Sequence, residues 1–468
     1  MRITLLAILI CFSFLKSHAV IAADYLQMLN SYVSVKLHLD SDPKRGQMVG
    51  AAWIRIRNNT DAPVSDIPYI LNPGLQVTKV LGGNNRPLNN TSRTLPIEGY
   101  EFLETTVGTI GLPTPVKPDS DIEVVIHFRG SLQNLSWAGI EHAKEELDKR
   151  FTILRADSFG YPIISAPTKA AINAALNQPP YYQTATIEMA DGYMIAGNLH
   201  IDEVTLKGAN QSFSLSYTNP STPMILPIAR YQQITEGPLV VSVLEGEQTA
   251  GATLISTLSP DLVRLNNLLG APTSGKLNIT MVPDGYGTLN TPGLVMLEQG
   301  GFTTTSVKPS GTLLNLWGIG TQHPKGHWRN SLDKVIQLSV SGEGLDAHTN
   351  TAFSDLKAAL STNKKLGKAT LESLTEAGST GSAELLSSMV LIGLHDIMGP
   401  DAFFAFIREL RSELRGNYAD NIAFSEFIAD NLKHKKAKKF AKNWLTGKKI
   451  GKDMKKSDSF SALIKRYK

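Results

Sequence analysis

The sequence contains a single cysteine, Cys11, in 468 residues. One thiol excludes an internal disulfide, so the fold does not depend on an oxidising compartment for its stability. Cys11 lies in the apolar run LLAILICFSFL. Ile10 precedes it, whereas a lipoprotein site requires a small residue. We therefore expect a mature chain that has no cysteine and carries no lipid at this position.

The sequence also lacks an apolar run of the ~20 residues that a membrane-spanning helix requires. The run around Cys11 is shorter, follows Arg2 and leads to the small exit residue Ala22. These features predict a secretory signal peptide at residues 1–22. We expect an exported protein, either periplasmic or secreted.

Several catalytic motifs are absent. The sequence has no GxSxG elbow, no GxxxxGK[ST] loop and no dinucleotide-binding glycine fingerprint. These absences argue against three large classes of enzyme, namely the α/β-hydrolase esterases, the P-loop nucleotide hydrolases and the Rossmann oxidoreductases.

Positive charge is concentrated at the end of the chain. The net charge is +4, but residues 433–468 hold 14 Lys and Arg against Asp453 and Asp458, a net of +12, so the remainder carries −8. Such a block attracts anionic surfaces, and it is equally typical of a solvated helical face. An anionic surface is therefore a candidate partner, and we expect no specific recognition of nucleic acid.

The first half of the chain has the period-two pattern of half-buried strands. Val33, Val35 and Leu37 alternate with polar residues in SYVSVKLHLD, and DIEVVIHFRG alternates in the same way. Turn clusters such as DSDPKRG and GGNNRP separate these segments. The pattern predicts an antiparallel β-sandwich of roughly 8–12 short strands over residues 23–229. EHAKEELDKRF and TKAAINAALNQ are predicted to be short helices within it.

The pattern changes near residue 230. GPLVVSVLEG and KLNITMVPDG are predicted strands, and Ser259 to Gly270 is a predicted helix with Ser259 as N-cap and Pro260 at its first position. From Ala352 onward the sequence is helical; GPDAFFAFIRELRSELRG, for example, places Phe403, Phe406, Ile407, Leu410 and Leu414 on one face. We expect a multi-domain α+β protein, with a second domain over residues 230–468 that ends in a helical bundle.

Several segments in chain order resemble one enzyme family. They are WIRIRNNT, IPYILNPGLQVTKVLGG, YYQTATIEMADGYMIAGN, VPDGYGTLNTPGLVMLEQGGF, LIGLHDIMGPDAFFAFIREL and NIAFSEFIADNL followed by FAKNWLTG. Together they resemble the gluzincin aminopeptidases, the alanyl-aminopeptidase-like metallopeptidases. The resemblance covers nearly the whole mature chain. It implies that the second domain is thermolysin-like and lies after an aminopeptidase-type β-sandwich.

The resemblance also implies a zinc site, in which two histidines at i and i+4 bind the metal and a glutamate beside the first acts as general base. Trp317-Gly318 matches the end of the family's zinc-binding helix. Counting back from this pair places Ser310 and Leu314 at the histidine positions and Gly311 at the base. None of these side chains can perform the corresponding role. We therefore expect no zinc, no other cofactor and no catalytic residue.

Three further positions implied by the resemblance are altered. Counting forward places Asp333 at the third zinc ligand, or Lys334 one step away. Asn290 replaces the glutamate that holds the substrate's α-amino group, and Glu384 falls nearest to the transition-state tyrosine. The catalytic apparatus is therefore predicted to be lost.

The edge strand that holds the substrate remains recognisable in GTLNTPGLVML. We expect a substrate-binding remnant of the cleft there, composed of Gly287, Asn290, Pro292, Gly293 and Leu294. Such a strand binds an extended peptide through its backbone, which requires no catalytic group. The predicted function is an exported, inactive aminopeptidase-like protein that binds a peptide or protein ligand.

An active metalloaminopeptidase or other hydrolase with an atypical metal site is the alternative. His323 and His327 have the i, i+4 spacing of zinc ligands and would need a carboxylate to complete the site. Pro324 and Gly326 lie within this segment and disfavour the helix that would place both imidazoles on one face. A surface loop is the competing interpretation.

Overall fold

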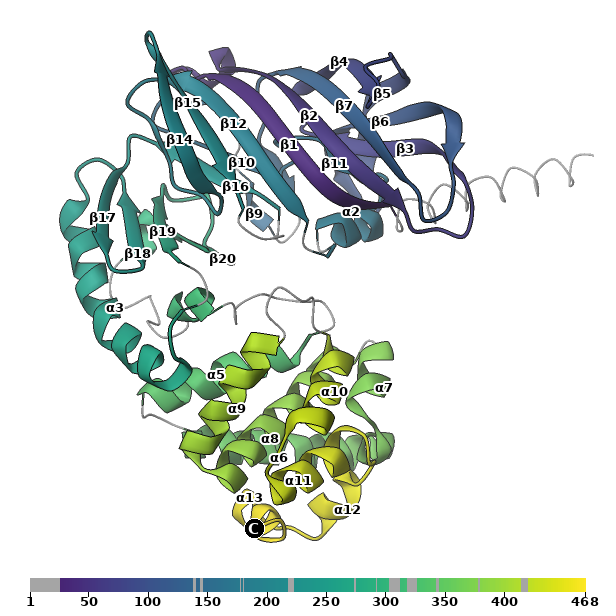
Figure 1. Ribbon diagram of the computed structural model, residues 1–468, viewed down its shortest axis with the longest axis vertical. Coiled ribbons are helices and arrows are strands. Elements are labelled where there is room, and N and C mark those ends of the chain that lie inside the picture. Colours follow the sequence, from purple (N-terminus) through teal and green to yellow (C-terminus); the bar gives the residue numbers. More distant parts are fainter. Residues whose placement is uncertain are drawn as a thin grey trace, which may run out of the picture.

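The protein has a mixed α+β fold, which confirms the predicted fold class (Figure 1). The computed structural model describes residues 26–137, 140–143, 146–176, 178–179, 181–217, 223–272, 275–291, 293–302, 312–317, 326–341, 345–377, 379–413 and 420–468. The predicted signal peptide lies outside these residues. Among them, none of the helices combines the length and the hydropathy needed to cross a membrane.

A seven-stranded sheet forms the outer layer of the first half of the chain. Its order is β14 (His200–Lys207), β15 (Asn210–Ser216), β12 (Tyr182–Ala190), β1 (Leu26–His38), β2 (Gln47–Asn58), β7 (Asp121–Gly130) and β4 (Leu75–Gly82). Val33, Val35 and Leu37 are buried, as the alternation predicts. Strands β1 and β12 pair in parallel, with Val33 opposite Ala185, and the other neighbours are antiparallel.

Smaller sheets complete the sandwich. They are β11 (Ile163–Ile164), β3 (Val64–Leu71), β6 (Tyr100–Val116) and β5 (Asn89–Ile97); β10 (Phe151–Arg155), β16 (Ile225–Ala229) and β13 (Met194–Ile195); and β8 (Leu135–Trp137) with β9 (Ile140–Ala143). A short 3-10 helix, η1 (Pro43–Arg45), and α2 (Lys169–Leu176) are also present. One apolar core joins the large sheet to the four-stranded sheet.

Two local predictions for this half were wrong. The described residues contain sixteen strands up to Ala229, more than predicted, and the helix expected at EHAKEELDKRF is absent. Part of that segment pairs as β9 with β8, and Asp148 instead accepts a hydrogen bond from the backbone N–H of Arg150 at 2.7 Å. Burial of the neighbouring β10, all five residues of which are buried, overrides the local helix propensity. The second predicted helix is α2.

A five-stranded sheet follows the sandwich, and two residues separate its first strand from the end of β16. Its order is β17 (Gln232–Glu236), β18 (Leu239–Val243), β19 (Leu277–Val282), β21 (Leu294–Glu298) and β20 (Leu289–Thr291). The division into domains at residue 230 remains a prediction.

Helix α3 (Gln248–Leu269) packs against this sheet and corrects the predicted helix start. The helix begins eleven residues before Ser259, and Pro260 lies inside it. Its N-terminal half buries Leu254, Ile255 and Leu258 in the same core as the sheet. This burial outweighs the backbone hydrogen bond that a proline removes from a helix interior. Gly270 ends the helix as predicted, with a φ of 72°.

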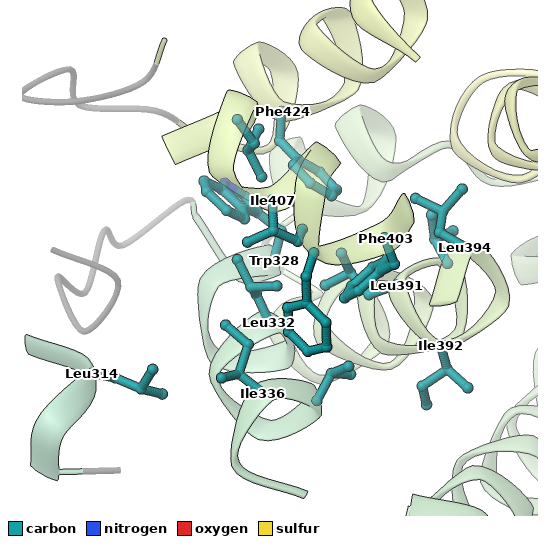
Figure 2. Packing of buried hydrophobic residues seen from close by; sticks show 14 of the residues in the cluster. Leu314, Trp328, Leu332, Ile336, Leu391, Ile392, Leu394, Phe403, Ile407 and Phe424 are labelled. Atoms are coloured by element: carbon teal, nitrogen blue, oxygen red, sulfur yellow. The ribbon is translucent and has the colours of Figure 1, made fainter. Parts of the chain in front are cut away.

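From Trp328 onward, the described residues form a helical bundle around α8 (Thr380–Met398), and the 3-10 helices η2 (Gln299–Gly301) and η3 (Leu314–Trp317) precede it. The other members are α5 (Trp328–Ser341), α6 (Leu345–Thr362), η4 (Lys364–Lys368), α7 (Leu371–Glu376), α9 (Pro400–Glu413), α10 (Asn421–Asn431), α11 (Lys435–Leu445), α12 (Ile450–Lys455) and α13 (Phe460–Lys465). Helix α8 is buried on all sides from Leu386 to Leu394, which is typical of a central helix. Figure 2 shows side chains of α5, α8, α9 and α10 meeting in this core. The predicted face of α9 is buried at Phe403, Phe406, Ile407 and Leu410, and Leu414 lies outside the described residues.

A third apolar cluster joins the sandwich to the five-stranded sheet. Phe151 and Tyr231 contribute from one side, and Tyr286, Leu294 and Met296 from the other. The Tyr231 hydroxyl donates to the Met281 carbonyl at 3.1 Å across the same junction. In Figure 1 the sandwich and the bundle lie at opposite ends, and the sheet with α3 connects them along one side.

Candidate functional site

The hairpin of β20 and β21 holds most of the residues that the sequence predicts as a binding remnant. Strand β20 is the last strand of its sheet, and Asn290 is opposite Val295 of β21. Gly287 and Gly293 have φ values of 81° and 77°, a left-handed conformation that favours glycine. The Glu298 carboxylate accepts the Gly287 N–H at 2.9 Å and thereby fixes the chain that enters β20.

The geometry of the hairpin orients the backbone of Asn290. Thr291 and Leu294 face each other on either side of two loop residues, and the pair that closes such a loop exchanges its backbone hydrogen bonds. Hydrogen-bonded and non-bonded pairs alternate along an antiparallel ladder. The N–H and C=O of Asn290 therefore point away from β21, toward the side of β20 on which no strand of the described residues pairs. We call this side the open edge of the sheet.

The side chain of Asn290 is engaged by a residue that the sequence did not indicate. The Asn315 side-chain amide donates to the side-chain oxygen of Asn290, and also to the Thr312 carbonyl at 3.2 Å. Asn315 is buried, whereas Asn290 is exposed. The sequence does show that Asn315 lies in the segment that aligns with the family's zinc-binding helix. Its contact with β20 depends on the fold and could not be predicted from that position.

Asn315 lies on a short 3-10 helix, η3 (Leu314–Trp317). All four residues of this helix are buried, and the Trp317 indole N–H donates to the Gly270 carbonyl at 2.8 Å. The alignment of Trp317 with the end of the zinc-binding helix predicts that Trp317 is helical and close to β20. Trp317 is helical, in a 3-10 helix, and Asn315 of the same helix contacts Asn290 of β20. The alignment of η3 with the family's zinc-binding helix stays a prediction.

Leu314 takes the position that the spacing assigns to the second zinc-binding histidine. Its side chain is 1% exposed and belongs to the large core of the second half of the chain. In Figure 2 it lies at the margin of this core, on a different helix from Trp328, Leu332 and Ile336 of α5. Ser310 and Gly311 lie outside the described residues.

Asp333, on α5, takes the position assigned to the third ligand. Its Oδ1 atom is buried and accepts no hydrogen bond from the described residues, although the residue as a whole is half-buried. Burial raises the pKa of Asp333 to about 7, and the nearby Arg329 guanidinium partly opposes this shift. The carboxyl group is therefore protonated more readily than an exposed aspartate.

These positions do not fit a zinc ion. A protein zinc site uses at least three side-chain ligands drawn from Cys, His, Asp and Glu. Leu314 has no ligating atom, and Asp333 is the only residue of the ligand set in the described part of the chain that has one. Across the described residues, no three His, Cys, Asp or Glu side chains come together in a way that could hold a metal.

The remaining candidate residues are dispersed. His327 lies just before α5, where its carbonyl accepts a weak hydrogen bond from Ser331 at 3.4 Å, and His323 is outside the described residues. Glu384 is an exposed residue of α8. Leu294 is fully buried at the junction with the sandwich, and Pro292 is outside the described residues.

A cavity of about 570 Å³ lies at the junction of the sandwich and the five-stranded sheet. Its walls carry charges of both signs, and they are formed by Glu146, Asp148, Lys149, Arg150, Phe151, Arg230, Leu244, Glu245, Pro283, Asp284, Tyr286 and Gln299. Tyr286 connects this cavity to Gly287, the next residue. Its ring meets Phe151 edge-on at 4.4 Å between centroids, and its carbonyl accepts from Arg155 at 3.4 Å.

The fold is similar to solved structures of M1 zinc metallopeptidases. An enzyme of this kind from Deinococcus radiodurans shares 14% identity over 90% of this chain and 94% of its own, with a TM-score of 0.57. A mutant of that enzyme with a bound Tyr-Ser-Ala substrate gives the same values. A two-domain M1 zinc metallopeptidase mutant bound to L-arginine shares 14% identity over the same fractions, with a TM-score of 0.58.

These likenesses show an aminopeptidase-like fold, as the sequence resemblance predicts. No family model and no curated protein matches the sequence.

Proposed function

We propose that this chain is an exported, non-catalytic aminopeptidase-like protein that binds an extended peptide along strand β20. One observation carries the proposal. The fold retains an open strand edge at Asn290, while the position of a zinc-binding histidine is filled by Leu314, buried in the core. Strand addition requires only backbone donors and acceptors, so a chain that has no catalytic side chains can still bind a peptide in this way.

Hydrolysis would need a group to activate water, and the sequence provides none at the expected place. Gly311 cannot accept a proton, and Leu314 cannot bind a metal. The neighbouring Asn315 holds the side-chain oxygen of Asn290, the position of the amine anchor. A ligand's α-amino group would have to displace this hydrogen bond and would meet no negative charge. The site therefore accepts internal segments of a peptide as readily as a free N-terminus.

Two variants at one position separate backbone binding from side-chain binding. Asn290→Pro removes an N–H that points away from β21, so the β20–β21 ladder keeps its hydrogen bonds. Asn290→Ala removes the side chain and keeps that N–H. We expect Asn290→Pro to weaken the binding of extended peptides about tenfold and Asn290→Ala to change it little. Fluorescence anisotropy with a labelled peptide library measures both affinities.

Metal analysis and an assay with an alanyl chromogenic substrate test the absence of catalysis. We expect no stoichiometric zinc and no release of the chromophore. One equivalent of zinc together with turnover would establish the active hydrolase instead. Equal peptide affinities for the two Asn290 variants would contradict binding at the strand edge.

A further inference from the structure

We infer that η4 and α12 together form a basic surface that docks on an anionic phospholipid bilayer. We call it the lysine face. It consists of Lys364, Lys365 and Lys368 from η4, and of Lys448, Lys449, Lys452, Lys455 and Lys456 from α12 and its two ends. All eight side chains belong to exposed residues.

The tertiary structure assembles this face from segments about eighty residues apart. Helix α12 packs directly on η4, and two glycines allow the contact. A Cβ atom at Gly451 would lie 3.0 Å from the Cα of Gly367, and the reverse substitution is equally close. Backbones that approach this closely place the lysines of both segments side by side. The sequence alone groups only the five C-terminal lysines of the lysine face.

Carboxylates do not neutralise the lysine face. Asp453, within α12, is buried and is used internally, accepting hydrogen bonds from the Tyr467 hydroxyl at 2.5 Å and the Trp444 indole at 3.2 Å. Among the described residues, none of the eight lysines forms an ion pair. Glu372 and Asp458 are exposed acids near its margins along the chain.

Two other carboxylates of the bundle pair with cations outside the lysine face. Asp396 of α8 pairs with Lys468 at 3.0 Å, and Glu409 of α9 pairs with Lys433 at 3.7 Å. The eight lysines form no ion pair in the described part of the chain, so the face carries an excess of positive charge.

The chemistry of the face favours a bilayer over nucleic acid. Single-stranded nucleic acid binds through exposed aromatic side chains, but Phe440, Trp444 and Phe460 of the neighbouring helices are buried. The lysine face contains no arginine. Its ammonium groups are hydrated point charges, and they lack the planar guanidinium group that binds a phosphate in a fixed, bidentate geometry. Mobile lipid headgroups adapt to such charges. Because the apolar stripe of α11 is buried in the bundle, the binding is electrostatic and involves no insertion.

The position of the face suits a surface-bound protein. In Figure 1, α12 lies at the end of the bundle remote from the sandwich. Docking through α12 would leave β20 and its hairpin directed away from the membrane. Lipid binding therefore does not compete with a ligand at β20.

Sedimentation of the full chain with vesicles tests the inference. We expect binding to mixed phosphatidylglycerol and phosphatidylcholine vesicles at low salt, weaker binding at ~0.15 M salt, and none to pure phosphatidylcholine. The triple substitution Lys365→Gln, Lys368→Gln and Lys452→Gln should lower the partition coefficient about a hundredfold, at about fivefold per lysine. Thermal unfolding confirms that this variant is folded.

A matched triple on the sandwich, Lys79→Gln, Lys117→Gln and Lys207→Gln, removes the same charge from exposed residues elsewhere. It should leave the partition coefficient unchanged. If both triple variants lost the same fraction of the partition coefficient, the binding would depend only on net charge, and the inference would be wrong. Binding to neutral vesicles, or equal affinity for duplex DNA at physiological salt, would overturn it as well.

Discussion

The Asn315 side-chain amide donates a hydrogen bond to the side-chain oxygen of Asn290, which links helix η3 to the edge strand β20. In an aminopeptidase of this architecture, the corresponding elements are expected to carry the zinc ligands and the amine anchor. Here a pair of neutral amides connects them. A neutral pair carries no charge for an ammonium group and holds no metal. The proposed peptide binding therefore depends on the backbone of β20.

Restoring charge at the amine anchor should change ligand preference. We expect Asn290→Glu to increase the affinity for peptides with a free α-amino group about fivefold relative to acetylated copies, because one exposed ion pair contributes up to about 1 kcal/mol. Competition anisotropy with matched peptide pairs measures the ratio. Asn290→Gln has the same length without the charge and should leave the ratio near one. A ratio that rises equally in both variants would argue that side-chain length, and not charge, decides the preference.

Restoring the zinc motif should not restore turnover. The triple variant Ser310→His, Gly311→Glu and Leu314→His still lacks an anionic amine anchor and a transition-state tyrosine, each of which normally contributes orders of magnitude to catalysis. An imidazole at position 314 would also enter a core in which Leu314 is 1% exposed. Zinc content and release from alanyl substrates provide the measurement. Efficient turnover would show that the rest of the active site is intact.

Asp333 should make the protein less stable as the pH rises. Burial raises the pKa of Asp333 to about 7 in the folded chain, whereas an unfolded aspartate titrates near ~3.9. Below the lower pKa, Asp333 is protonated in both the folded and the unfolded state, so its titration does not change the free energy of unfolding. Between the two values the folded state binds more protons, and its stability falls until the pH passes about 7.

Asp333→Asn should remove this dependence. The free energy of unfolding of the variant should equal that of the wild type near the lower pKa. At alkaline pH it should be higher than that of the wild type by at most about 4 kcal/mol. Urea unfolding across this pH range gives the two curves. Asp355→Asn, at an exposed position of α6, is the control and should leave the wild-type slope in place. Parallel curves for wild type and Asp333→Asn would show that the carboxyl group is solvated.

The contact between α8 and α11 should depend on a glycine. A Cβ atom at Gly393 would lie 2.5 Å from Cζ of Phe440, whose ring packs against Trp444 and Tyr467. We expect Gly393→Ala to destabilise the protein by about 1–2 kcal/mol, because overpacking exceeds the gain in helix propensity. Gly381→Ala, on the same helix with no atom near its added Cβ, should be neutral or stabilising. Chemical denaturation compares the two, and a stabilised Gly393→Ala would show that the Phe440 ring moves at little cost.

The sequence by itself determined the elements that local periodicity specifies. Alternation predicted which side chains of β1 are buried, and a helical stripe predicted the buried face of α9. Gly270 predicted the end of α3, because glycine readily adopts the φ of 72° found there. The order of the segments also predicted the aminopeptidase-like fold. All of these features depend on residues close together in the chain.

Only the tertiary structure decided the features that depend on distant partners. Packing against a sheet extended α3 through Pro260, and strand pairing replaced the helix predicted around Asp148. Asn315 reached Asn290 because β20 and η3 meet in the fold, and Gly367 met Gly451 to assemble the lysine face. Periodicity reports which face of a segment is apolar. The segment that covers that face is decided by the total apolar surface that the whole fold buries. A local sequence pattern carries no information about that total.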